Sequence, residues 1–256
     1  MQTVREILDF LWSIAPEAGK EPWDNVGHLV GRRNASVDHI LVSLDITMPV
    51  IHEAIEKGTQ LIVSPHPLIW DSYKHVTDSI FQQDKVLTLA EHRIGAICMH
   101  TNLDEAEDGV DDTLAEALGL KPECHLAEGT IGHVSMLPEP MDLQDFLPMV
   151  KEKLHANGLR YCNGGRPVQR IATGCGSCGE YFADAVKAGC DTFITGDVKY
   201  SVMIDALGQG INLIDAGHYP TENPIVAKLQ RKLQAQFPDV QVEIAESIAQ
   251  PDQFFI

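Results

Sequence analysis

Basic side chains are scarce in this chain of 256 residues, which has 19 lysines and arginines against 37 aspartates and glutamates, a formal net charge of −18. Such an excess of negative charge argues against a surface that follows the phosphates of DNA or RNA. The acidic residues are spread along the chain, so an ordinary solvated acidic surface is the simplest interpretation. We therefore do not expect nucleic acid as a partner, whereas cations would be attracted.

Long apolar runs are also absent. No stretch of about 18 apolar residues exists, so we expect no membrane span. The first residues, MQTVREILDFLWSIAP, lack the basic segment and apolar block of a secretion signal. Their apolar residues instead share one face of a helix: Val4, Ile7, Leu8, Leu11 and Trp12. The sequence thus predicts an amphipathic first helix and a cytoplasmic protein without a membrane partner.

A second CxxC pair is missing as well. Six cysteines without a secretion signal indicate free thiols in a reducing compartment. Cys175 and Cys178 form a single CxxC, and a zinc ribbon would need another such pair. The pair could be redox-active, or its glycine-rich loop could hold an anion, or it could be a tight turn with small side chains. The sequence leaves its role open.

What the chain does contain is an alternation of strand-like and helical segments, with 44% hydrophobic residues to build a core. In the first half, strand-like runs at 39–45, 60–64 and 96–100 alternate with helical runs at 48–57 and 85–93. In the second half, strand-like runs at 170–174, 192–195, 211–215 and 240–245 alternate with helical runs at 180–188, 198–207 and 222–236. This alternation predicts an α/β fold.

The middle of the chain breaks this alternation. A strand is expected at 131–137, then a turn bounded by Pro138 and Pro140, then a helix at 143–155. Glycine and proline interrupt the periodicity near 122–128. We place a boundary between two α/β units there.

Polar side chains with metal-ligating atoms follow several of the predicted strands, where α/β proteins bind ligands. His66 follows one strand on a loop stiffened by Pro65 and Pro67. Asp104 follows a second strand, and His218 follows a third. Imidazole nitrogens and carboxylate oxygens are ligands for zinc, iron or manganese. Together these residues predict a metal site.

His218 and Glu222 are four residues apart, with Pro220 between them. Because proline interrupts a regular helix, we place His218 on a loop and Glu222 in the first turn of the following helix. Thr221 is the expected N-cap.

Each of these residues also has a simpler explanation. A single histidine at a strand end is more often a satisfied polar residue than a ligand. Asp104 could form an Asx turn with its neighbours. Glu222 could serve only as a first-turn charge that interacts with the helix dipole. The metal interpretation depends on the combination of several strand ends.

The same regions resemble one known family. Five segments match its motifs in order: WDNVGHLVG at 23–31, PHPLIW at 65–70, HTNLD at 100–104, TGDVKY at 195–200 and DAGHYPTE at 215–222. They resemble the NIF-three-like family, whose members are often named GTP cyclohydrolase I type 2 homologues. The resemblance covers most of the chain.

The resemblance implies a fold of two interlocked α/β units with mixed sheets, in which the last helix and strand return to the first unit. It places residues 1–124 and 217–256 in a metal-site domain and residues 125–216 in a second domain. It also implies a hexameric ring around dinuclear metal sites. Carried over residue by residue, the metal ligands are His66, Asp104, His218 and Glu222.

The chain departs from the family pattern at one ligand. Family members have two adjacent histidines before the PL motif, and the first of them is Pro65 here. Proline has no ligating side chain, so the site could hold one ion instead of two. Alternatively, water or a nearby side chain such as His100 could take the missing place.

These features lead to a first hypothesis, a metal-dependent hydrolase in which Zn, Fe or Mn activates water. Glu222 or Asp215 would act as the proton shuttle. The family name suggests a small-molecule substrate, either a nucleotide or another heterocycle. The alternatives are a non-catalytic metal carrier or metal-dependent binding module, and a structural ring with a vestigial site. The sequence alone does not decide whether the chain is an enzyme.

Overall fold

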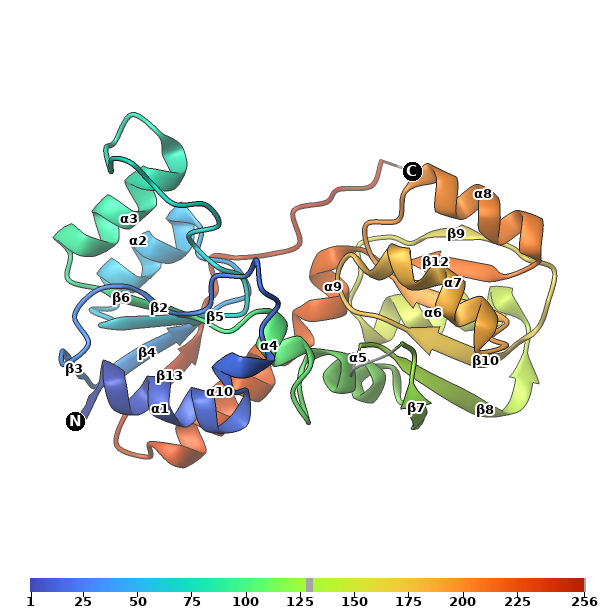
Figure 1. Ribbon diagram of the computed structural model, residues 1–256, viewed down its shortest axis with the longest axis horizontal. Coiled ribbons are helices and arrows are strands. Elements are labelled where there is room, and N and C mark those ends of the chain that lie inside the picture. Colours follow the sequence, from blue (N-terminus) through green and yellow to red (C-terminus); the bar gives the residue numbers. More distant parts are fainter. Residues whose placement is uncertain (128–130, 256) are drawn as a thin grey trace. The chain divides into compact units, whose positions relative to one another are not determined.

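The computed structural model describes residues 1–127 and 131–255, and it is a mixed α/β protein, as the sequence predicts (Figure 1). Its contacts divide the chain into two compact units. The first unit contains Met1–Glu107 and Val226–Ala249, and the second contains Asp108–Ile225 and Gln250–Ile256. Each unit has its own sheet and core, and each is described by itself.

The first unit is built on a mixed sheet with the strand order β13-β4-β5-β6-β2. Its strands are β4 (His39–Val42), β5 (Leu61–Ser64), β6 (Gly95–Cys98), β2 (Gly27–Val30) and β13 (Gln241–Ile244). Neighbouring strands from β13 to β6 are parallel, and β2 is antiparallel to β6. The strands β4, β5 and β6 are fully buried, which is typical of parallel strands covered on both faces.

Helices connect these strands, as the alternation predicts. They are α1 (Val4–Ile14), α2 (Met48–Glu56), α3 (Phe81–Glu91) and the short α4 (Thr101–Asp104), with a 3₁₀ turn η1 (Glu17–Gly19). The strands β1 (Gln2–Thr3) and β3 (Ser36–Val37) pair antiparallel in a separate two-stranded ribbon. Thr3 and Glu6 form a capping box at the start of α1. The predicted amphipathic helix is confirmed, because Val4, Ile7 and Leu11 are buried.

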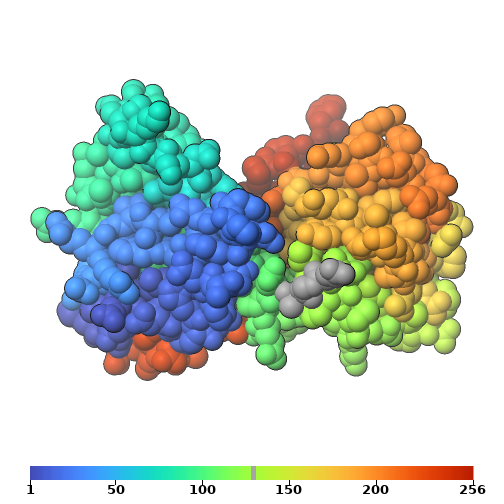
Figure 2. Space-filling view, viewed as in Figure 1, coloured from blue at the N-terminus to red at the C-terminus, as the bar shows by residue number. Residues whose placement is uncertain are grey.

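The last helix and strand of the chain return to this first unit. Helix α10 (Pro224–Gln236) leads to β13, which pairs in parallel with β4. Phe237, just after α10, packs edge-on against Phe10 of α1 at 5.5 Å between ring centroids. In Figures 1 and 2 the orange-red residues of α10 lie against the blue N-terminal residues. The sequence prediction that the last helix and strand return to the first unit is therefore correct.

Glu53 of α2 anchors the segment that follows β13. Its carboxylate accepts hydrogen bonds from the backbone N–H of Glu246 at 3.0 Å and of Ser247 at 2.9 Å, and it pairs with Lys57 at 3.0 Å. Burial acts to raise the pKa of Glu53, but these hydrogen bonds outweigh it and lower the pKa to about 2. The charged carboxylate thus stabilises the folded unit.

We expect Glu53→Gln to lower the free energy of unfolding by about 2 kcal/mol at pH 7. The folded-state pKa lies below the unfolded one, so this contribution is present above about pH 4.5 and is lost as the pH falls towards about 2. Urea unfolding at pH 7 and pH 3 measures the difference between wild type and variant. Glu56→Gln, on the exposed face of the same helix, is the control. An unfolding difference independent of pH would contradict this assignment.

The second unit has a mixed sheet with the strand order β7-β8-β10-β11-β12-β9. Its strands are β7 (Pro122–His125), β8 (His133–Met141), β9 (Arg160–Cys162), β10 (Val168–Thr173), β11 (Thr192–Thr195) and β12 (Asn212–Asp215). The central strands β10, β11 and β12 are parallel, and the outer pairs are antiparallel. This parallel centre matches the predicted strands of the second half.

The helices of the second unit are α5 (Val110–Leu118), α6 (Leu143–Lys153), α7 (Phe182–Lys187), α8 (Tyr200–Gln209) and α9 (His218–Glu222), with a 3₁₀ turn η2 (Cys178–Tyr181). A core cluster around Phe193 of β11 includes Phe182 of α7, Ala206 of α8 and Leu213 of β12. This packing fixes the central strands and therefore the loops that follow them.

The predicted turn between Pro138 and Pro140 is wrong, because β8 continues to Met141. The register of β8 against β10 shifts between Arg170 and Val168, and both prolines lie at this irregularity. Their missing backbone N–H groups therefore remove no regular ladder bond.

The compact units begin and end at other residues than the predicted domains. Helix α5 contacts β8 and β10 and also α9, so residues 108–124 and 217–225 lie with the second unit. The predicted domains, 1–124 with 217–256 and 125–216, stay a prediction. Among the described residues, no helix is both long and apolar enough to cross a bilayer.

Candidate functional site

In the first unit, polar side chains gather where the parallel strands end. Asp45 lies three residues beyond β4, His66 lies two beyond β5, and His100 lies two beyond β6. The register pairs Val42 with Val63 and Ser64 with Cys98, so these strands end side by side. The topology therefore brings the three side chains to one edge of the sheet.

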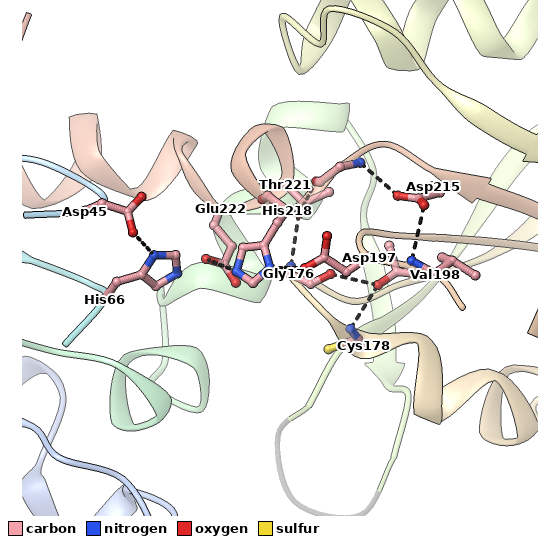
Figure 3. Close-up of polar contacts among 12 residues, drawn as sticks. Asp45, His66, Gly176, Cys178, Asp197, Val198, Asp215, His218, Thr221 and Glu222 are labelled. Carbon is pink, nitrogen blue, oxygen red and sulfur yellow. Dashed lines mark hydrogen bonds and ion pairs between the residues drawn. The ribbon is translucent and has the colours of Figure 1, made fainter. Parts of the chain in front are cut away.

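His66 is oriented by a carboxylate. Its Nδ1 lies 2.7 Å from Oδ1 of Asp45, and only 14% of the His66 side chain is exposed (Figure 3). Because a carboxylate can only accept, Nδ1–H is the donor, and in the neutral ring Nε2 carries the lone pair. The backbone N–H of His66 donates to Leu44 at 3.1 Å, which fixes the loop. A histidine held in this way is ready to ligate a metal through Nε2.

His100 is held in the same way by Asp24, which precedes β2 and has a fully buried side chain. Asp24 Oδ1 accepts from His100 Nδ1 at 2.9 Å, and Oδ2 accepts from the Thr101 hydroxyl at 2.6 Å and the Thr101 N–H at 3.0 Å. Burial acts to raise the pKa of Asp24, but the hydrogen bonds from His100 and Thr101 outweigh it and lower the pKa to about 2. Asp24 is therefore charged at neutral pH.

In the second unit, the remaining groups lie where the parallel strands of its own sheet end. Gly176 follows β10, Asp197 follows β11, and His218 follows β12. The register pairs Thr173 with Ile194 and Thr195 with Asp215, so these strands also end together. Asp197 adopts a left-handed backbone with a φ of 51°, a conformation that aspartate tolerates better than most residues.

The prediction that His218 lies on a loop is wrong, because His218 is the first residue of α9 and Glu222 is the last. Pro220 lies within the first turn, where the N–H that proline lacks has no helical partner. Thr221 is not the N-cap. Its hydroxyl lies 2.9 Å from the carbonyl of Gly217 and accepts from the N–H of Gly176 at 3.0 Å.

One helical turn thus brings His218 and Glu222 together. His218 Nε2 lies 3.2 Å from Oε2 of Glu222, and His218 Nδ1 lies 2.7 Å from Oδ2 of Asp197 (Figure 3). The Glu222 side chain is 12% exposed. With Nδ1–H donated to Asp197, the lone pair of neutral Nε2 faces the Glu222 carboxylate, and two acceptors this close need a proton or a cation between them. Two atoms that ligate one ion at about 2.0–2.2 Å are themselves about 3.0–3.5 Å apart.

The glycine-rich loop after β10 closes against this pair. Gly176 has a φ of 55°, and a Cβ at this position would fall on Oε1 of Glu222 and 3.1 Å from Nε2 of His218. The N–H of Gly196 donates to the carbonyl of Gly176 at 2.8 Å. A side chain at Gly176 would therefore occupy the space next to both candidate ligand atoms.

The other two predicted site residues, Asp104 and Asp215, lie at the ends of α4 and β12. Asp104 ends α4 and its N–H donates to the carbonyl of His100 at 3.1 Å, which places it at the same edge of the first sheet. Asp215 is buried at the end of β12, where it accepts from the N–H of Val198 at 3.2 Å and of Gly217 at 3.1 Å. Burial raises the pKa of Asp215. Asp215 holds the turn that begins α9.

Comparison with known proteins identifies the family. The family model Duf34/NIF3 (NGG1p interacting factor 3) matches residues 2–253. The chain belongs to the Duf34/NIF3 family. This confirms the resemblance that its motifs indicate.

Relatives of this NIF3 protein agree in length and fold. A Clostridium acetobutylicum protein named GTP cyclohydrolase 1 type 2 homolog is 36% identical over 239 residues, 90% of this chain and 89% of that protein. The Staphylococcus aureus hypothetical protein SA1388 is 28% identical with a TM-score of 0.91, covering 99% of both chains. A Bacillus cereus protein related to NIF3 has a TM-score of 0.94 at 22% identity, covering 100% of this chain and 99% of the other, and shares the fold.

Sequence reasoning missed the carboxylates that orient the histidines of this NIF3 chain. Asp24 and Asp197 lie inside two of the matched motifs, but the motifs alone did not assign them a role. Asp45 is the last residue of the strand-like run predicted at 39–45, and it lies three residues beyond β4. The signal that could have found all three is their position, since each lies within three residues of a strand end, where the ligands also lie.

Cys175 and Cys178 form no disulfide among the described residues of this NIF3 chain. The N–H of Cys175 donates to the buried Asp111 at 2.9 Å, and the N–H of Cys178 donates to the hydroxyl of Thr195 at 3.2 Å. These backbone bonds shape the loop that presents Gly176. The contacts give the CxxC segment a structural part in the site and leave the redox interpretation a prediction.

Proposed function

We propose that this NIF3 protein binds a divalent cation, and that His218 and Glu222 are its ligands together with His66 and Asp104. His66, His218 and Glu222 offer two imidazole nitrogens and a carboxylate oxygen. This set of donors suits zinc, iron or manganese. The proposed site holds one or two such ions.

The observation that supports this most strongly is the pair of facing acceptors in α9. Nε2 of His218 and Oε2 of Glu222 are 3.2 Å apart, while Asp197 accepts the hydrogen bond that the other ring nitrogen donates. His66 repeats the carboxylate contact through Asp45. Carboxylates that hold Nδ1 of a ligating histidine are a regular feature of metal sites. The donor arrangement in each unit thus fits a cation.

We further propose that the chain is a metal-dependent hydrolase acting on a nucleotide or another heterocyclic small molecule. A divalent ion would supply Lewis acidity, polarising a substrate oxygen or activating water. Glu222 would hold the ion and take up a proton during the reaction. Asp215, whose pKa is raised by burial, is the second candidate for moving a proton. Its two hydrogen bonds from backbone N–H groups also keep α9 in place.

The hydrolase proposal is tested with purified chain that is either loaded with Zn²⁺ or Mn²⁺ or stripped with a chelator. We expect turnover of at least one substrate from a panel of nucleotides, phosphoesters and cyclic amides by the loaded chain. The stripped chain and His218→Ala should be inactive, because both lack the bound cation. His155→Ala, in the same unit beyond α6, is the control and should keep full activity. If the loaded chain transforms none of these compounds, catalysis is excluded for these substrate classes.

A non-catalytic metal carrier remains the second candidate because the His218 side chain is 35% exposed, which favours exchange of a bound ion. Rapid transfer of the ion to a chelator without any turnover would support the carrier.

Assembly into a hexamer is proposed from the family resemblance, and sedimentation of the purified chain tests it.

A further inference from the structure

In the first unit, three neighbouring side chains hold the ring of His100. Trp70 contacts it edge-on at 5.1 Å between ring centroids, Trp23 does so at 6.0 Å, and Asp24 holds Nδ1. Both tryptophans are more than half exposed, so they pack on the imidazole at the surface of the unit. The position and tautomer of His100 are therefore set by its neighbours.

The other ring nitrogen of His100 is left open. Nδ1–H donates to Asp24, so Nε2 carries the lone pair in the neutral ring. Among residues 1–127 and 131–255, Nε2 of His100 has no hydrogen-bond partner, although only 16% of the side chain is exposed. Nε2 does not belong to the described buried side-chain atoms that lack a partner, so its lone pair is open to solvent or to a cation. In the contact of its Nδ1 with Asp24, His100 repeats the contact of His66 with Asp45.

The distance between the rings of His66 and His100 also allows both to ligate one ion. The His66 and His100 ring centroids are 5.9 Å apart with planes at 80°. The centroid of a ligating imidazole lies about 3.2 Å from the ion, so two imidazoles on one ion are at most about 6.4 Å apart. The observed separation falls inside this limit. Two ions about 3.5–4 Å apart, each with one imidazole, would fit as well.

We propose that His100 is an additional metal ligand, with Asp24 as its orienting carboxylate. This inference rests on the proposed function, since it assumes that the chain binds a divalent cation through His66. It supplies a second imidazole in a chain where proline precedes His66. His100 would then coordinate through Nε2, just as His66 would.

The test is zinc X-ray absorption spectroscopy, which counts imidazoles, combined with Zn²⁺ affinity measured by competition with a chelating dye. The variant is His100→Asn, because the asparagine amide can still donate to Asp24 but has no atom in the place of Nε2. We expect one imidazole fewer per chain and an affinity at least about tenfold lower. Asp24→Asn should keep the imidazole count and lower the affinity about 10–100-fold, as loss of an orienting partner does.

His92→Ala is the matched control, an exposed histidine just after α3 and before β6 begins, at the opposite edge of the sheet. It should match the wild type in both measurements. Circular dichroism establishes that each variant is folded, and His100→Gln replaces His100→Asn if the latter is not. An unchanged imidazole count and affinity in the His100 variant overturns this inference while the proposed function stands. A wild type that binds no Zn²⁺ overturns both.

Discussion

Replacing Glu222 with glutamine is expected to lower the affinity for Zn²⁺ by more than about 100-fold. The loss should exceed the roughly 10–100-fold that removing an orienting partner costs, because Glu222 is proposed to touch the ion directly. The glutamine amide can donate to Nε2 of His218, which faces it at 3.2 Å in the wild type. The variant should therefore fold normally. Dye competition gives the affinity, and thermal unfolding in chelator gives the stability of the metal-free protein.

Glu180→Gln is the control for charge, since Glu180 is an exposed carboxylate of the same unit in η2. It should leave the affinity within about twofold of wild type, because a solvent-exposed charge that does not ligate the ion is screened. If Glu222→Gln also binds Zn²⁺ as tightly as wild type, Glu222 is not a ligand.

Alanine at Gly176 should damage both the site and the fold. Its Cβ would fall on Oε1 of Glu222 and lie 3.1 Å from Nε2 of His218, and the φ of 55° is unfavourable for a residue with a side chain. We expect the free energy of unfolding to fall by about 2–4 kcal/mol, of which the left-handed backbone accounts for about 1–2 kcal/mol. Zn²⁺ affinity should fall with it, since the pair would be pushed apart. Chemical unfolding and dye competition measure the two effects.

Gly189→Ala is the control that separates the free-energy cost of a left-handed backbone from the cost of the steric clash with Glu222 and His218. Gly189 has a φ of 72° in the same unit, but nothing lies within 4 Å of the added Cβ. This variant should lose only about 1–2 kcal/mol and keep its Zn²⁺ affinity. Equal losses in both variants would show that Gly176 is needed for its backbone alone and that the space beside Glu222 is not restricted.

Much of the fold could be predicted from the sequence because each parallel strand is short, apolar and followed by a polar loop. The run from Leu61 to Ser64 and its end before His66 are examples. The turn predicted at Pro138 and Pro140 failed because a strand tolerates proline where its register is irregular, and that depends on its partner. Local composition does not contain this information.

The candidate ligands could also be named from the sequence, but the sequence does not show which carboxylate orients which histidine. Asp45 meets His66, and Asp197 meets His218, only because neighbouring parallel strands end at the same level. The helical turn that joins His218 to Glu222 is not evident from the sequence, because proline breaks the interior of a helix whereas the first turn of a helix accepts it, as it accepts Pro220 here. Such features depend on strand register and on position within a helix.

The most direct test of the central claim is anomalous diffraction from crystals grown with Zn²⁺ or Mn²⁺ and measured on both sides of the metal absorption edge. The account predicts an anomalous peak within about 2.0–2.2 Å of both Nε2 of His218 and a carboxylate oxygen of Glu222. A metal-replete crystal that shows His218 and Glu222 clearly, with no anomalous density between them, would contradict it.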